Sequence, residues 1–131
     1  MTTLLRWYLK LLAGLTLISG IGQLTLPARL GTASAWGVAP GWQREIAFWD
    51  LAMYIVIAGT LRTNDAVSGR TVATALVALQ LLVATNHAAA AIGGHGLLNA
   101  IMAAVNSACV VLGILALRPR AAGQDLASRA A

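Results

Sequence analysis

Charged residues are scarce in this chain. Only 10% of its 131 residues are Asp, Glu, Lys or Arg, whereas a soluble domain has about 25%. Apolar residues make up 59%, above the ~45–50% of an average soluble domain. These proportions exclude an ordinary soluble globular protein, and we expect one all-α domain embedded in a membrane.

Cysteine is nearly absent, since Cys109 is the only one and lies inside an apolar block. No intrachain disulfide can form, and thiol redox chemistry is not expected. The chain also lacks CxxC, HExxH and glycine-rich phosphate-binding patterns, so we expect no metal and no cofactor, although a quinone or pigment stays compatible. Its basic residues lie between the apolar blocks and not in one patch with aromatics, which argues against nucleic-acid binding.

Four apolar blocks predict four transmembrane helices in an antiparallel bundle. They cover about residues 11–26, 46–61, 71–92 and 97–117, and a flexible cytoplasmic tail is expected over 121–131. The second block is only ~24 Å long as a helix, short of the ~30 Å hydrocarbon core. It can span only if the helix continues into its flanks or the bilayer thins locally.

The first block also imitates a secretory signal peptide, because Arg6 and Lys10 precede it and the A-x-A pattern 33–35 follows it. We prefer a retained helix. The stretch after the block is long for a cleavage region, and cleavage would leave a three-helix remnant.

The basic residues predict the orientation. With a cytoplasmic N-terminus, two basic residues, Arg29 and Arg44, lie outside. The other seven lie inside: Arg6, Lys10, Arg62, Arg70, Arg118, Arg120 and Arg129. Both termini are therefore expected in the cytoplasm. The loop over 27–45 then faces outward, as a flexible lid or an ordinary interfacial loop anchored by its aromatic residues.

Small residues suit close helix packing in lipid, and Ala100, Ala104 and Ala108 form a stripe in the last block. Such a stripe either packs the monomer or serves a homo-oligomer or a partner membrane protein.

Polar side chains gather at one predicted depth, near the outer surface. Asp50 is the only acidic residue inside an apolar block, and an ionisable group there is costly enough to suggest a function. The candidate ligand-binding residues at this depth are Gln23, Glu45, Trp49, Asn86, Asn99 and Asn106. Asn99 and Asn106 are seven residues apart and share one helix face. We predict a polar pocket in the outer leaflet, open to the outside.

Asp50 and His87 are the candidate catalytic pair. Their predicted depths match on neighbouring helices, so we expect them within hydrogen-bonding reach. The carboxylate would then orient the imidazole as an acid/base couple, or the two would form a structural clasp. Glu45 also fits an interfacial ion pair with Arg44 or Arg29. His95 fits an exposed turn or the mouth of the pocket. A metal site formed by Asp50, His87 and His95 is a further alternative.

The Trp49-Asp50 step opens the second helix, Asn86-His87 closes the third, and Asn99 opens the fourth. On these positions, residues 4–118 resemble the small four-helix bacterial membrane proteins grouped as BphX-like and DoxX-like. The resemblance implies a four-helix bundle in a bacterial inner membrane and assigns no catalytic residue.

The leading hypothesis is a membrane protein that binds a small lipophilic molecule, with membrane lipid around it, and transforms it by acid/base chemistry. Isomerisation, cyclisation or hydration fits, since an isomerase, cyclase or hydrolase of this kind needs proton transfer in a dry cavity and no cofactor. One alternative is a non-enzymatic accessory subunit of a larger membrane complex. The other is a dimeric proton-coupled exporter in which Asp50 titrates.

Overall fold

The computed structural model describes residues 1–119, of which 87% are helical and none is in a strand. The helices are α1 (Thr3–Thr25), α2 (Pro27–Ala33), α3 (Pro40–Thr63), α4 (Ala66–Ile92) and α5 (Gly96–Leu117). All except α2 are long and apolar enough to cross a membrane. The predicted all-α class with four potential spans is confirmed, while the predicted tail over 121–131 lies outside the described residues.

Three of the long helices begin at least five residues before their apolar blocks, because capping residues or a proline start them in the preceding sequence. The Thr2 hydroxyl accepts a hydrogen bond from the Leu5 backbone N–H at 3.2 Å and starts α1. Pro40 starts α3, where its fixed φ suits the first turn and its missing N–H costs nothing. At 24 residues, α3 is ~36 Å long, which resolves the predicted shortfall of the second block. Asp65 caps α4 in the same way as Thr2 caps α1, accepting from the Ser68 N–H at 2.7 Å.

A short helix, α2, occupies part of the predicted loop over 27–45. Gly31 in α2 is buried, and a Cβ there would lie 2.8 Å from the Val38 Cα and would overlap the Gln43 side chain. Glycine at this position therefore lets α2 pack closely against the connection to α3 and its first turn.

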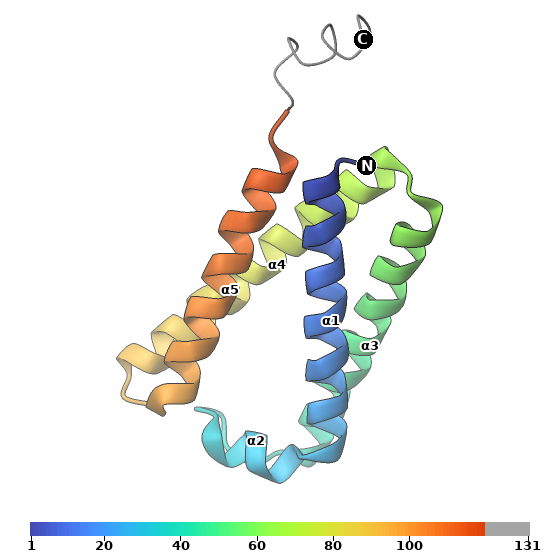
Figure 1. Cartoon of the computed structure of the whole chain (residues 1–131). Helices are drawn as coiled ribbons and strands as arrows, with labels where there is room; N and C mark the ends of the chain where they lie inside the picture. The colour runs from blue at the N-terminus through green and yellow to red at the C-terminus, as the bar shows by residue number, and fades with distance from the viewer. Residues whose placement is uncertain (120–131) are drawn as a thin grey trace, which may run out of the picture.

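The four long helices form two pairs, α1 with α3 and α4 with α5 (Figure 1). The pairs meet near the end that holds the N-terminus and diverge toward the end that holds α2. The core explains this shape, because its buried residues come from the beginnings of α1 and α4 and the ends of α3 and α5. They are Leu5, Tyr8, Leu9, Leu12, Ala13, Ile57, Ala73, Leu76, Cys109 and Ala116.

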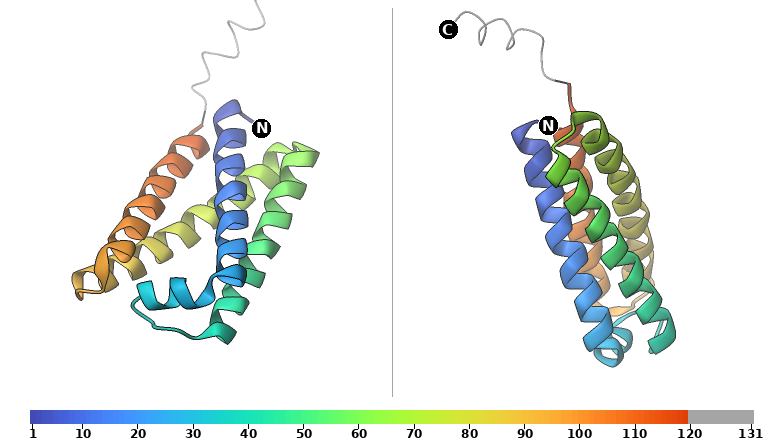
Figure 2. Two further views of the ribbon diagram at one scale, coloured as in Figure 1. Left: turned by 60° about the horizontal axis from the view of Figure 1, so that its bottom comes forward. Right: turned by 90° about the vertical axis from the view of Figure 1, so that its right-hand side faces the viewer.

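The N-terminus and the end of α5 lie at the same end of the molecule. Asn64, with φ 53°, and Asp65 form the tight turn between α3 and α4. The Arg70 guanidinium then donates a hydrogen bond to the Leu117 carbonyl at 2.9 Å, tying the start of α4 to the end of α5. Figure 2 shows the N-terminus, this turn and the end of α5 at one end of the molecule. We call it the terminal end, and the opposite end the α2 end.

Candidate functional site

At the α2 end, three side chains from separate segments come together. The His87 Nδ1 on α4 lies 2.9 Å from the Asn99 Oδ1 on α5. Asn99 is only 1% exposed, and its Nδ2 donates a short hydrogen bond to the His95 carbonyl. Trp36, from the α2–α3 connection, lies edge-on to the His87 ring with centroids 5.3 Å apart. We call Trp36, His87 and Asn99 the histidine cluster.

The hydrogen bonds of Asn99 fix the tautomer of His87. A backbone carbonyl only accepts, so the Asn99 nitrogen faces His95 and its oxygen faces His87. An amide oxygen also only accepts, so the neutral His87 ring carries its proton on Nδ1. Nε2 then keeps a free lone pair, which can accept a hydrogen bond or a proton from a ligand.

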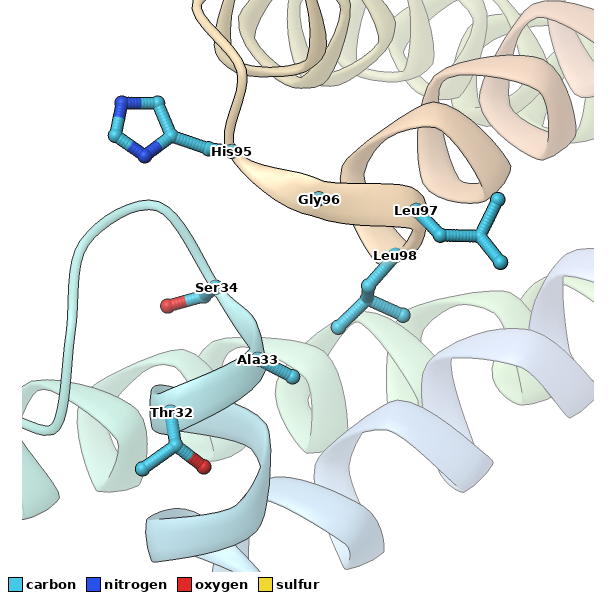
Figure 3. Close-up of a pocket in the computed structure, with 7 residues that line it drawn as sticks. All are labelled: Thr32, Ala33, Ser34, His95, Gly96, Leu97 and Leu98. Atoms are coloured by element: carbon cyan, nitrogen blue, oxygen red, sulfur yellow. The ribbon is translucent and has the colours of Figure 1, made fainter.

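A hollow of about 430 Å³ opens between the end of α2 and the beginning of α5 (Figure 3). Its lining adjoins the histidine cluster in the chain, since Ser34 comes shortly before Trp36 and Leu98 directly precedes Asn99. The lining residues are Thr32, Ala33, Ser34, His95, Gly96, Leu97 and Leu98. Three of these residues are polar (Thr32, Ser34 and His95) and three are apolar (Ala33, Leu97 and Leu98), so the hollow suits a small molecule with both kinds of surface.

Asp50 lies in a different place, the seam between α1 and α3. The Ser19 hydroxyl of α1 lies beside its carboxyl. A Cβ on Gly20 would lie 3.3 Å from the Ala47 carbonyl oxygen and 3.1 Å from Leu51 Cγ, so the two backbones approach closely here. One Asp50 carboxylate oxygen, Oδ2, is buried without a hydrogen-bond partner.

The predicted hydrogen bond between Asp50 and His87 is therefore wrong for this structure. His87 bonds to Asn99 on α5, while Asp50 packs toward α1. The physical reason is the pairing of the helices: α3 and α4 leave their common turn in diverging directions, so equal depth does not bring their side chains together (Figure 1).

The other candidates are dispersed. Asn106 is buried, but its Nδ2 donates to the Met102 carbonyl of its own helix at 2.6 Å. Glu45 and Trp49 are exposed and line, with Phe48, a second hollow of about 290 Å³. Asn86 is exposed beside His87, and Gln23 is half-buried on α1. Their predicted roles in ligand binding stay predictions.

Metal ligands do not gather in the part of the chain that the structure describes. Within residues 1–119, no group of three or more His, Cys, Asp or Glu side chains could hold a metal ion. Asp50, His87 and His95 thus do not form the cluster considered above. The expectations of no metal and no cofactor stay predictions.

Sequence reasoning misses two residues of these sites. The sequence indicates only a membrane-surface position for Trp36, because its contact with His87 depends on the path of the α2–α3 connection. Gln43 is 5% exposed with an unpartnered, buried Oε1. The sequence does contain a signal for Gln43. It lies seven residues before Asp50, so the two share a helix face if the helix begins at Pro40.

Comparison with known proteins adds nothing to this geometry: the chain matches no known protein family, no curated protein and no solved structure.

Proposed function

We propose that this chain is a bacterial inner-membrane protein of the BphX-like or DoxX-like kind that binds a small lipophilic molecule at its α2 end. The observation that carries the proposal is the histidine cluster, in which buried Asn99 orients His87 and leaves Nε2 free. The adjoining hollow of about 430 Å³ offers room for a small molecule. A few well-placed polar groups beside a concave hollow are a common composition for small-molecule sites.

We place the four helices across the membrane as an antiparallel bundle with both termini in the cytoplasm. The described basic residues support this orientation. Two of them, Arg29 and Arg44, lie toward the α2 end, and the others lie toward the terminal end: Arg6, Lys10, Arg62, Arg70 and Arg118. Arg120 and Arg129 lie outside the described residues. Basic residues favour the cytoplasmic side, so the histidine cluster faces the outer leaflet.

His87 is the candidate base in any chemistry at this site. Its Nε2 would take a proton from the bound molecule, while Asn99 holds the ring and stabilises the Nδ1–H. Proton transfer of this kind suits an isomerisation, cyclisation or hydration that needs no cofactor. Asp50 has no part in this step, because it lies in the α1–α3 seam.

The test is to ask which small molecules stay with the purified full-length chain. Organic extracts of the wild type are compared by mass spectrometry with extracts of Asn99→Leu and His87→Phe at equal protein amounts. We expect one lipophilic compound enriched in the wild type and reduced at least ~tenfold in both variants, as the loss of one buried polar contact implies.

Asn106→Leu is the matched control, because this second buried asparagine of α5 bonds only within its own helix. It should retain the compound. An extract in which no compound is enriched over the detergent blank contradicts the proposal. Equal retention by all variants contradicts the site. A membrane protein that co-purifies in place of any compound favours an accessory subunit.

A further inference from the structure

Unpaired buried oxygens concentrate on two helices, α1 and α3. Four buried side-chain atoms of residues 1–119 have no hydrogen-bond partner, and three of them lie in the halves of α1 and α3 next to α2: Gln23 Oε1, Gln43 Oε1 and Asp50 Oδ2. The fourth, Tyr8 Oη, lies in the core at the terminal end. All three atoms are acceptors, so none of them donates a hydrogen bond to another.

The register of the two helices places these oxygens in sequence along the seam. Gly20 of α1 sits opposite Ala47 and Leu51 of α3, and Ser19 lies beside Asp50. Gln23 lies one turn, ~6 Å, further toward the α2 end on the same face of α1. It therefore falls between the levels of Asp50 and Gln43, which are ~10.5 Å apart along α3. A glutamine side chain at that level can reach toward either neighbour.

The charge of this group is not balanced by the protein. Among residues 1–119, no basic side chain forms an ion pair with the Asp50 carboxylate, whose interacting neighbour is the uncharged Ser19. Unpaired buried charges and unsatisfied polar oxygens are both costly, most of all within a membrane. The seam therefore lacks positive charge and has a surplus of oxygen ligands.

We propose that the α1–α3 seam binds one small monovalent cation, with Asp50, Ser19 and Gln23 as its ligands and Gln43 closing the site toward α2. Carboxylate, amide and hydroxyl oxygens are the ligands that hard cations take. A single carboxylate balances one positive charge, whereas divalent sites generally use more than one. Neither hollow described above is lined by Asp50, so the seam suits a bare ion better than an organic amine.

The experiment measures thermal unfolding of the full-length chain in detergent micelles. Choline chloride is replaced stepwise by sodium chloride at constant total chloride, so that ionic strength does not change. A ligand that binds only the folded state raises Tm as it saturates the site. We expect the wild-type Tm to rise with sodium and level off, and Asp50→Asn to abolish this dependence.

Asp65→Asn is the matched control, since it removes an exposed carboxylate at the terminal end by the same chemical change. It should keep the full sodium response. Gln23→Leu removes one oxygen without changing the charge, and should require roughly tenfold more sodium for the same rise. If Asp50→Asn does not fold, the sodium response of Gln23→Leu tests the proposal in its place.

Two results would overturn the proposal. One is a wild-type Tm that is equal in sodium and choline at all concentrations. The other is a sodium response that survives in Asp50→Asn or is unweakened in Gln23→Leu. None of these measurements depends on the lipophilic ligand at the histidine cluster, so the two proposals fail or stand separately.

Discussion

At the scale of single residues, one buried amide determines what His87 can do. Asn99 uses its nitrogen on the His95 carbonyl, and only its oxygen is left for the imidazole. The same hydrogen bonds join α4, the α4–α5 turn and α5, so the residue has a structural and a chemical role at once. Asn106, two turns later, has the same side chain and neither role, because it bonds to its own helix.

Asp65 allows a pH prediction at this scale. The Ser68 backbone N–H donates to its exposed carboxylate and lowers the pKa of that carboxyl below its usual range. Because the unfolded pKa is higher, the stabilisation is fully present above the unfolded pKa and is lost as pH falls through the folded pKa. We expect Asp65→Ala to lower Tm at pH 7, and the difference from wild type to shrink progressively as pH falls from 7 to below the unfolded pKa of ~3.9.

The measurement is thermal unfolding in micelles across this pH range, with each variant compared to wild type at the same pH. Asp65→Asn separates the cap from its charge, because an Asn side chain also caps but does not titrate there. Its Tm should stay close to that of wild type at pH 7. A difference between Asp65→Ala and wild type that does not change with pH would rule out the carboxylate as the stabilising group.

At the scale of helices, α5 depends on a glycine where it crosses α1 and α4. Gly113 is buried, and a Cβ there would overlap a methyl of Val77 and lie 2.8 Å from the Tyr8 hydroxyl oxygen. Tyr8 belongs to the core that joins the two helix pairs, and Val77 packs against that core. We expect Gly113→Ala to destabilise the fold by about 1–3 kcal/mol through overpacking.

Gly59→Ala provides the comparison. Gly59 lies inside α3, and a Cβ there would meet nothing within 4 Å, so alanine should be neutral or stabilising by about 0.5–1 kcal/mol. Unfolding of both variants in mixed micelles gives the two free-energy changes. If Gly113→Ala proved as stable as Gly59→Ala, the close approach of α1, α4 and α5 would be wrong.

The helices themselves were predictable from sequence, but their beginnings were only partly so. Long apolar runs indicate a helix in lipid whatever its neighbours are, and all four runs became long helices. Three starts lay earlier in polar sequence, where Thr2, Pro40 and Asp65 begin the first turn. The missed start at Pro40 also hid Gln43, because no helix face was assigned to it.

The site was predictable in depth but not in partner. Counting residues from the helix ends gives the depth of Asp50 and of His87 along the bundle. Depth alone does not say which way a side chain points or which helix it meets. The rotation of each helix and the choice of neighbour come from packing, here from glycines such as Gly20 that allow α1 to approach α3. Asp50 consequently faces Ser19, and His87 faces Asn99.

At the scale of the whole molecule, orientation in the membrane is the property to test. We expect cysteine at Ser34, at the α2 end, to react with a membrane-impermeant thiol reagent in intact cells. Cysteine at Ser68, beside the α3–α4 turn, should stay unlabelled until the membrane is permeabilised. Both are placed in a Cys109→Ala background, since Cys109 is the only native thiol. The reverse pattern would put the histidine cluster on the cytoplasmic side.

The pairing of the helices also bears on how the chain is made. Each pair consists of two consecutive long helices. Most contacts of α1 and α3 are with each other, so they can form before the chain after the Asn64–Asp65 turn has been made. The chain can therefore enter the bilayer as two successive hairpins, the first already carrying the polar seam between its own two helices. Only the core at the terminal end and the Trp36 contact with His87 wait for the second hairpin. The core at the terminal end is thus completed last during synthesis, because it includes Cys109 and Ala116 of α5, whereas the histidine cluster needs no residue beyond Asn99.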